Sequence, residues 1–168
     1  MGTIAKIPGT VLFIRTADHC PAHVHAANAQ QGWEIRVFFS YASDELDWQI
    51  KCGQPAKSEI EDCMAEVWAR IEDCRAQWWR DLKKLCLDNK QVELNGAILR
   101  TVPPQKSVKT AKPTMPARGP KGKAKMVKSV ISPAVLTVKP KSATYDPATK
   151  SVEFTALGSD VIHTGKCP

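Results

Sequence analysis

The chain has 168 residues, of which 43% are hydrophobic, and its formal net charge is +7. This length suits one medium domain, or a small domain with appendages. No apolar run approaches the roughly 18 residues of a membrane span, and the N-terminus lacks the pattern of a secretory signal. None of the six cysteines forms a Cys-x-x-Cys pair, so we expect reduced thiols in a cytoplasmic protein.

The positive charge is unevenly distributed along the chain. Residues 1–100 carry 12 Lys or Arg and 14 Asp or Glu, whereas residues 101–168 carry 12 and 3. This asymmetry indicates an acidic partner for the C-terminal part, such as nucleic acid, or only a solvated tail.

The first hundred residues begin with a series of predicted strands. Residues 10–15, "TVLFIR", are β-branched and apolar. Residues 33–41, "WEIRVFFSY", and residues 46–52, "LDWQIKC", alternate partly between apolar and polar side chains, as half-buried strands do. Short turns join these segments, which favours an antiparallel meander.

The spacing of the apolar residues then changes to that of a helix. The segment "SEIE", Ser58 to Glu61, has the form of a capping box at a helix N-terminus. Apolar residues recur after it at helical spacing: Ile60, Met64, Val67, Ile71, Trp78 and Leu82. We expect one long helix from about Ser58 to Leu87, with its apolar side across one face of the meander.

The rest of the chain contains two short hairpin patterns separated by a basic segment. Asn95-Gly96 lies between apolar positions and predicts a hairpin within residues 92–102. Residues 103–125 hold five prolines, seven Lys or Arg and no acid, which is typical of a flexible linker. Residues 126–168 predict two strands around the polar turn 146–150, with too few apolar residues for an independent domain. We expect this hairpin to dock on the first domain or on another chain.

These elements predict an α+β fold: a small antiparallel sheet packed against one long helix, plus a basic linker and a C-terminal β-hairpin. We assign residues 1–102 to the α+β domain that contains the histidine motif. Residues 103–125 form the linker, and residues 126–168 form the hairpin extension.

The segment "DHCPAHVHA", Asp18 to Ala26, contains three of the four histidines. His23 and His25 are two residues apart, so on a strand their side chains point to the same face. His19 can fold back toward the pair across Pro21, and the Asp18 carboxylate can orient one imidazole.

Three kinds of chemistry stay open for this segment. The imidazoles can be hydrogen-bonded structural groups. His23 and His25 can bind a divalent metal ion with Cys20 or His19 as a third ligand, because His-x-His is a frequent ligand spacing. His19, His23 and His25 can also act as catalytic acids and bases near neutral pH.

The N-terminal half resembles the bacterial domain-of-unknown-function family 4160 over about residues 2–85. That family shows Met-Pro-Thr-Ile, an apolar strand, and then Asp-His-x-Pro-Pro-His-Phe-His-Ala. Ala22 and Val24 replace the second proline and the phenylalanine, and the matching residues are Thr3, Ile4, Asp18, His19, Pro21, His23, His25 and Ala26. The resemblance implies a toxin–antitoxin or regulator setting, because genes of this family often lie beside those of family 2442.

The linker supplies candidate binding residues. Its basic side chains can contact phosphates without sequence preference: Lys106, Lys109, Lys112, Arg118, Lys121, Lys123 and Lys125. The linker has no aromatic residue on which a base can stack. Trp79 cannot fully share the apolar face of Trp78, so we expect it to be exposed for a partner contact.

Two functions fit these features. The first is a small binding module of a toxin–antitoxin-like or anti-defence system, which contacts a protein partner or nucleic acid through its basic C-terminal region. The alternative is a small His-dependent nuclease toxin, with or without a metal ion. Neither hypothesis involves a membrane.

Overall fold

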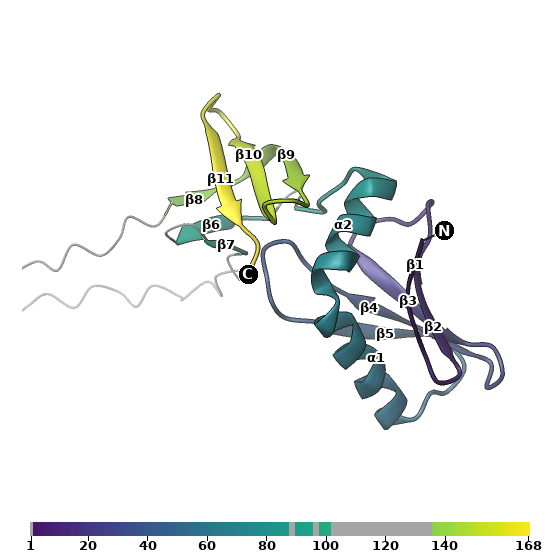
Figure 1. Cartoon of the computed structure of the whole chain (residues 1–168). Coiled ribbons are helices and arrows are strands. Elements are labelled where there is room, and N and C mark those ends of the chain that lie inside the picture. Colours follow the sequence, from purple (N-terminus) through teal and green to yellow (C-terminus); the bar gives the residue numbers. More distant parts are fainter. Residues whose placement is uncertain (1, 88–89, 96–97, 102–135) are drawn as a thin grey trace, which may run out of the picture.

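The computed structural model describes residues 2–87, 90–95, 98–101 and 136–168. These residues form two β-sheets and two helices (Figure 1). The predicted linker, residues 103–125, lies outside the described residues. Within the described part of the chain, no helix is long and apolar enough to cross a membrane.

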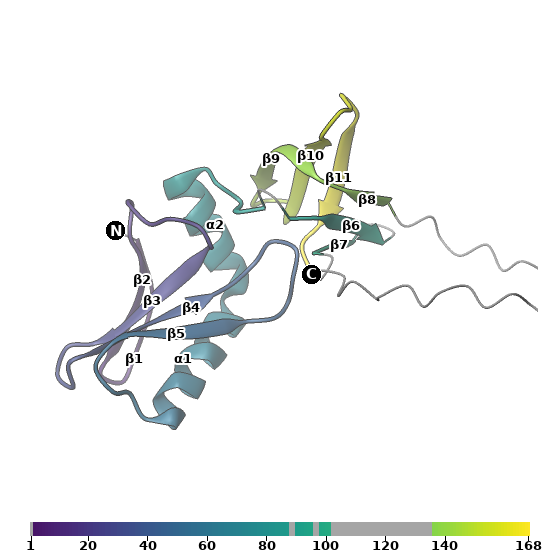
Figure 2. The ribbon, with the colours of Figure 1, turned by 180° about the vertical axis from the view of Figure 1, so that it is seen from behind.

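Sheet A is an antiparallel meander with the strand order β1-β2-β3-β4-β5, which confirms the predicted arrangement of the first strands. Its strands are β1 Gly2–Ile7, β2 Thr10–Ile14, β3 His23–Asn28, β4 Trp33–Phe38 and β5 Asp47–Cys52. Directly paired residues share a face of a sheet. Val24 pairs with Val37 and faces the helices, whereas His25 pairs with Phe13 and Arg36 on the other face. The His25 side chain therefore lies on the face of sheet A opposite the helices, and Figure 2 shows β4 and β5 of this sheet in front of α1.

The prediction of one long helix was wrong, because the helical region divides into α1 (Lys57–Ala69) and α2 (Ile71–Leu82). Arg70 between them has φ −120° and ψ 27°, outside the helical region. Apolar spacing continues across this residue through Val67 and Cys74, both buried, so the sequence pattern carries no sign of the break. The capping residues also differ from the expected Ser58–Glu61 pair, because Glu59 Oε2 accepts the Ala56 N–H at 2.7 Å.

Sheet B contains six strands in the order β8-β6-β7-β11-β10-β9. Its strands are β6 Val92–Asn95, β7 Ile98–Thr101, β8 Leu136–Val138, β9 Pro140–Asp146, β10 Ser151–Ala156 and β11 Ile162–Lys166. Both predicted hairpins are present as β6–β7 and β9–β10. The expected C-terminal hairpin is nevertheless part of a larger sheet, since β11 pairs in parallel with β7 through Lys166 and Ile98. The boundary placed at residue 102 thus separates strands that share one sheet.

Sheet B docks on α2 and on the loop between β4 and β5 through Arg75, a fully buried arginine. Its guanidinium donates to the carbonyl oxygens of Ser40 (2.7 Å and 3.0 Å), Ser43 (3.2 Å) and Pro168 (3.0 Å). The marked C-terminal end accordingly lies beside the β4–β5 loop in both views (Figures 1 and 2). Docking on the first domain, one of the two expected alternatives, is confirmed.

Glu72 balances the charge of Arg75 and extends the contact into sheet B. Its Oε1 accepts from Arg75 Nη1 at 2.8 Å, and its Oε2 accepts from the Tyr145 hydroxyl of β9 at 3.0 Å. The Tyr41 hydroxyl donates to the Arg75 carbonyl at 2.6 Å, and the rings of Tyr41 and Tyr145 meet edge to face. One ion pair and two tyrosines therefore join the helix to both sheets.

The expectation of fully reduced cysteines was wrong in one case. Cys20 and Cys86 form a disulfide with a Cα–Cα distance of 5.3 Å across 66 positions of sequence. Such a pairing has no local sequence signal, because only the fold brings the two residues together. Cys63 and Cys74 are free and buried, and burial raises the pKa of their thiols to about 11 and about 12.

Replacing Arg75 should test how strongly sheet B depends on this contact. Arg75→Met leaves the Ser40, Ser43 and Pro168 carbonyls without their donor and Glu72 without its counter-charge. We expect the free energy of unfolding to fall by about 3 to 5 kcal/mol, as when one partner of a buried ion pair is removed. Urea denaturation measures this change. Arg80→Met is the matched control, because Arg80 is 71% exposed; equal losses in both variants would contradict the proposed role of Arg75.

Candidate metal centre

The candidate site begins in the loop between β2 and β3, where a tight turn fixes Asp18. The Asp18 N–H donates to the Arg15 carbonyl at 3.2 Å, and Asp18 Oδ2 accepts the Arg15 N–H at 2.8 Å. These two bonds anchor the loop residue to the end of β2. The other carboxylate oxygen, Oδ1, is directed at the histidines of β3.

His23 and His25 point to the same face of β3, as predicted, and neither side chain is exposed to solvent. Their Nε2 atoms are 3.2 Å apart. Phe13 stacks on the His25 ring with centroids 5.3 Å apart. Phe38 and Trp78 pack against the His23 ring at 5.7 Å and 5.5 Å, so aromatic residues enclose both imidazoles.

The hydrogen bonds at Nδ1 determine which nitrogen of each ring carries a proton. His23 Nδ1 lies 2.8 Å from the Pro21 carbonyl oxygen, and His25 Nδ1 lies 2.6 Å from Glu34 Oε1. Both oxygens are acceptors, so each Nδ1 must donate. In the neutral tautomers that follow, both Nε2 atoms carry lone pairs, and both face Asp18 Oδ1.

With both Nε2 atoms unprotonated, three acceptor atoms meet at one point, and a cation placed there would satisfy them. Asp18 Oδ1 lies 3.0 Å from His25 Nε2 and 3.6 Å from His23 Nε2. With the 3.2 Å between the two nitrogens, these distances form a triangle. Three ligands at about 2.0 to 2.1 Å around a tetrahedral ion stand roughly 3.3 to 3.4 Å apart. Asp18, His23 and His25 can therefore hold a divalent metal ion.

Each of the three residues also has the orienting contact that metal ligands normally have. Glu34 orients His25, the Pro21 carbonyl orients His23, and the Arg15 N–H holds Asp18. Such contacts select the tautomer and make the imidazole a stronger ligand. A proton on His25 Nε2, bonded to Asp18 Oδ1, would supply the positive charge in place of a metal ion.

The charges around the site shift three pKa values. Desolvation by burial lowers the pKa of His23, although the Pro21 hydrogen bond and the Asp18 charge oppose it. Desolvation raises the pKa of Asp18, but the Arg15 and His25 hydrogen bonds outweigh it and the net pKa is lowered. For Glu34, hydrogen bonds from Lys51 and His25 likewise outweigh desolvation and lower the pKa. These shifts favour a neutral His23 and ionised carboxyl groups. A metal ion at His25 Nε2 would replace the hydrogen bond between that atom and Asp18 Oδ1.

The structure separates the predicted site residues into two groups. His19 is exposed, and its ring centroid lies 5.8 Å from that of His23, so it adjoins the centre without joining it. Cys20 is not a ligand here, because its sulfur is bonded to Cys86. The third ligand position belongs to Asp18, which the sequence suggested only as an orienting group.

The structure also differs from the prediction for Trp79 and adds one residue, Glu34, to the site. Trp79 is partly buried and lies under the Lys83 ammonium group at 5.3 Å, whereas Trp68 is 48% exposed. Glu34 was not predicted as part of the site, although it alternates with the buried Trp33 and Ile35 on β4. The seven basic candidates of the linker lie outside the described residues: Lys106, Lys109, Lys112, Arg118, Lys121, Lys123 and Lys125.

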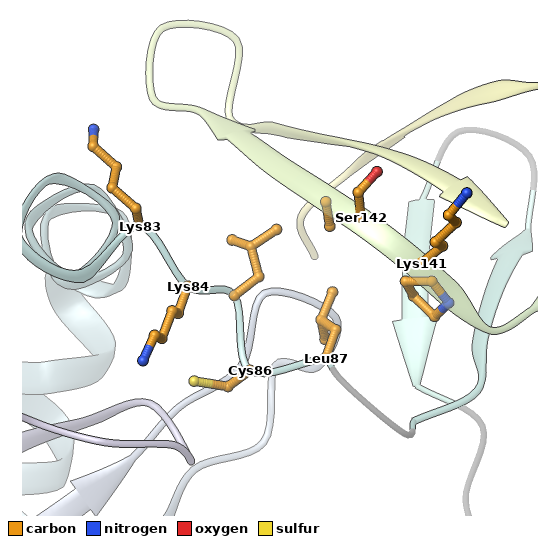
Figure 3. A pocket seen from close by; sticks show the side chains of 9 residues that line it. Lys83, Lys84, Cys86, Leu87, Lys141 and Ser142 are labelled. Atoms are coloured by element: carbon orange, nitrogen blue, oxygen red, sulfur yellow. The ribbon is translucent and has the colours of Figure 1, made fainter. Parts of the chain in front are cut away.

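A separate pocket of about 130 Å³ lies between the chain after α2 and the start of β9 (Figure 3). Three lysines line it, but Figure 3 shows the Lys83 and Lys84 side chains directed away from its centre. Leu85, Leu87 and Pro140 are among the other residues that line it. The pocket therefore lacks the converging charges of an anion site.

Neither a protein-family model, nor a curated protein, nor a solved structure matches this chain. The resemblance to family 4160 remains a prediction from the sequence.

The lowered pKa of His23 predicts an acid-sensitive fold. The unfolded histidine binds a proton below about pH 6.5, while the folded one resists it, so the unfolded state takes up more protons. The free energy of unfolding of the metal-free protein should fall as pH decreases below about 6.5, by at most about 1.4 kcal/mol per pH unit from this residue. Urea titrations across this range, with a chelator present, measure the slope. His23→Asn keeps a donor for the Pro21 carbonyl but cannot titrate, so an unchanged slope in that variant would contradict the prediction.

Proposed function

We propose that this protein is a binding module whose α+β core is stabilised by one divalent metal ion at Asp18, His23 and His25. The observation that carries this proposal is the meeting of three acceptor atoms at distances of 3.0 to 3.6 Å. Imidazole and carboxylate ligands suit zinc and several other divalent metals. Zn²⁺ is therefore the probe of choice.

Burial favours a structural rather than a catalytic ion. A catalytic metal ion keeps a coordination position that a substrate must be able to reach through the protein surface. His23 and His25 have no exposed surface, and the Asp18 side chain is 8% exposed. A nuclease that uses these imidazoles as acid and base would have to uncover them first. The nuclease hypothesis consequently has less support than the binding module.

The binding activity is assigned to residues 103–125, the acid-free basic segment of the chain. Seven Lys or Arg side chains within 23 positions can neutralise several phosphates of a nucleic acid. The metal-stabilised core would then serve as the folded unit that carries this segment. A role in a toxin–antitoxin or anti-defence system rests on the sequence resemblance alone and stays a prediction.

Zinc should bind with one ion per chain and raise the stability of the protein. At a free Zn²⁺ concentration about 1,000 times the dissociation constant, linkage predicts a gain of about 4 kcal/mol in the free energy of unfolding. Asp18→Asn should abolish most of this gain, because the amide has no negative charge but can still accept the Arg15 N–H. Isothermal titration calorimetry and thermal unfolding measure the two effects.

His163→Ala is the control for this experiment, since His163 lies on β11 against Phe154. It should bind Zn²⁺ as the unaltered chain does. Equal zinc binding by Asp18→Asn and the unaltered chain would contradict the metal centre.

Binding of an oligonucleotide should depend on salt through the basic segment. In fluorescence anisotropy, replacing the seven Lys and Arg of residues 103–125 by Gln should remove most of the affinity. The slope of log K against log salt should become shallower by about 0.7 to 0.9 for each phosphate that the segment no longer neutralises. Seven Gln replacements keep the length of the segment, so chain length is not a variable. A salt-independent affinity, or no binding of DNA or RNA, would contradict a nucleic-acid partner and favour an acidic protein.

A further inference from the structure

Among the strands that the structure describes, β5 is an edge of sheet A with no partner on its outer side. It pairs with β4 on one side, and all six of its residues are exposed. The Trp48 N–H donates to the carboxylate of its own neighbour Asp47 at 2.8 Å instead of to another strand. Unpaired backbone groups along an edge strand are a template for a further strand.

An apolar surface accompanies this edge on the side of the helices. Trp48 pairs with Val37 and Ile50 pairs with Ile35, so both side chains lie on the face that α1 and α2 cover. The helix α1 packs over β4, and Trp48 and Ile50 beyond it are 41% and 43% exposed. Trp68 on α1 is 48% exposed. We call Trp48 and Ile50 the β5 apolar surface; tryptophan is enriched at the energetic centres of interfaces.

The sequence of β5 is complementary to itself when two copies run antiparallel about Gln49. In this register Asp47 lies opposite Lys51 of the second copy, and Lys51 lies opposite its Asp47. Trp48 and Ile50 lie opposite each other on the apolar face. Opposite charges and apolar–aromatic pairs at directly facing positions stabilise antiparallel strands.

We propose that β5 pairs with β5 of a second copy and joins the two A sheets into one ten-stranded sheet, with Gln49 on the two-fold axis. The Ile50 carbonyl of the second copy then accepts the Trp48 N–H in place of the Asp47 carboxylate. Asp47 is released to meet Lys51 of the second copy. This interface involves none of the three metal ligands and no residue of the basic segment, so it goes beyond the proposed function. Lys51 also donates to Glu34 Oε1 at 3.0 Å, and in the dimer it lies between that carboxylate and Asp47 of the second copy.

The charges of β5 favour a second copy over an unrelated strand as the occupant. Any strand can satisfy the backbone groups, but pairing with β5 also places one acid and one base opposite each other at both ends. A C2 interface of this kind is self-complementary by construction. Each apolar side chain then gains a partner without any change in the fold of the single chain.

Cysteine cross-linking tests the register. In a Cys52→Ser background, which removes the exposed native thiol of β5, Gln49→Cys should give a disulfide-linked dimer on mild oxidation. Facing residues of an antiparallel pair are about 4.5 to 5.5 Å apart, within disulfide range. Lys57→Cys, at a side chain that is 90% exposed, is the control and should remain monomeric. Equal cross-linking at both positions would overturn the proposal.

Sedimentation equilibrium tests the energetics. The unaltered chain should dimerise, and Trp48→Lys should raise the dissociation constant by at least about 30-fold, the effect of a loss of about 2 kcal/mol at an interface. Leu157→Lys alters a residue that is 69% exposed on sheet B and should leave the constant unchanged. Thermal unfolding at low concentration confirms that both variants fold. A monomer at about 100 μM, or a dimer that survives Trp48→Lys, would overturn the proposal.

Discussion

The buried guanidinium of Arg75 is the interaction on which the arrangement of the two sheets depends. A buried cation is tolerated only when its charge is balanced and its donors are satisfied. Glu72 supplies the charge, and carbonyl oxygens from the β4–β5 loop and from Pro168 supply acceptors. The three chain segments must therefore meet at α2, and sheet B is positioned by this requirement as much as by apolar contact.

The histidine cluster is the opposite case, because buried acceptor atoms rather than a buried cation must be satisfied there. Acceptor atoms of Asp18, His23 and His25 meet in a place with little solvent, where a cation would satisfy them. Trp78 links this site to the helix, because its ring packs against His23 while its indole N–H donates to the Lys84 carbonyl. The Cys20–Cys86 disulfide joins the loop of the site to the same segment after α2. A metal ion there would strengthen a region that already has a covalent link.

These contacts distinguish a stabilising role from a partner-binding role, which the sequence alone did not separate. The histidine motif looked like an accessible site, but its rings are enclosed by Phe13, Phe38 and Trp78. Exposed apolar side chains lie elsewhere, including on β5. In the proposed binding module, the closed centre would stabilise the fold and the outer surfaces would contact partners.

The sequence by itself determined the local features of this protein. The alternation of β4, the Asn95-Gly96 hairpin and the common face of His23 and His25 follow from residues a few positions apart. Only the tertiary structure decided the break at Arg70, the disulfide, the parallel pairing of β7 with β11, and the approach of Glu34 to the histidines. The physical reason is that these features depend on contacts between distant segments, whose energies leave no periodic trace along the chain.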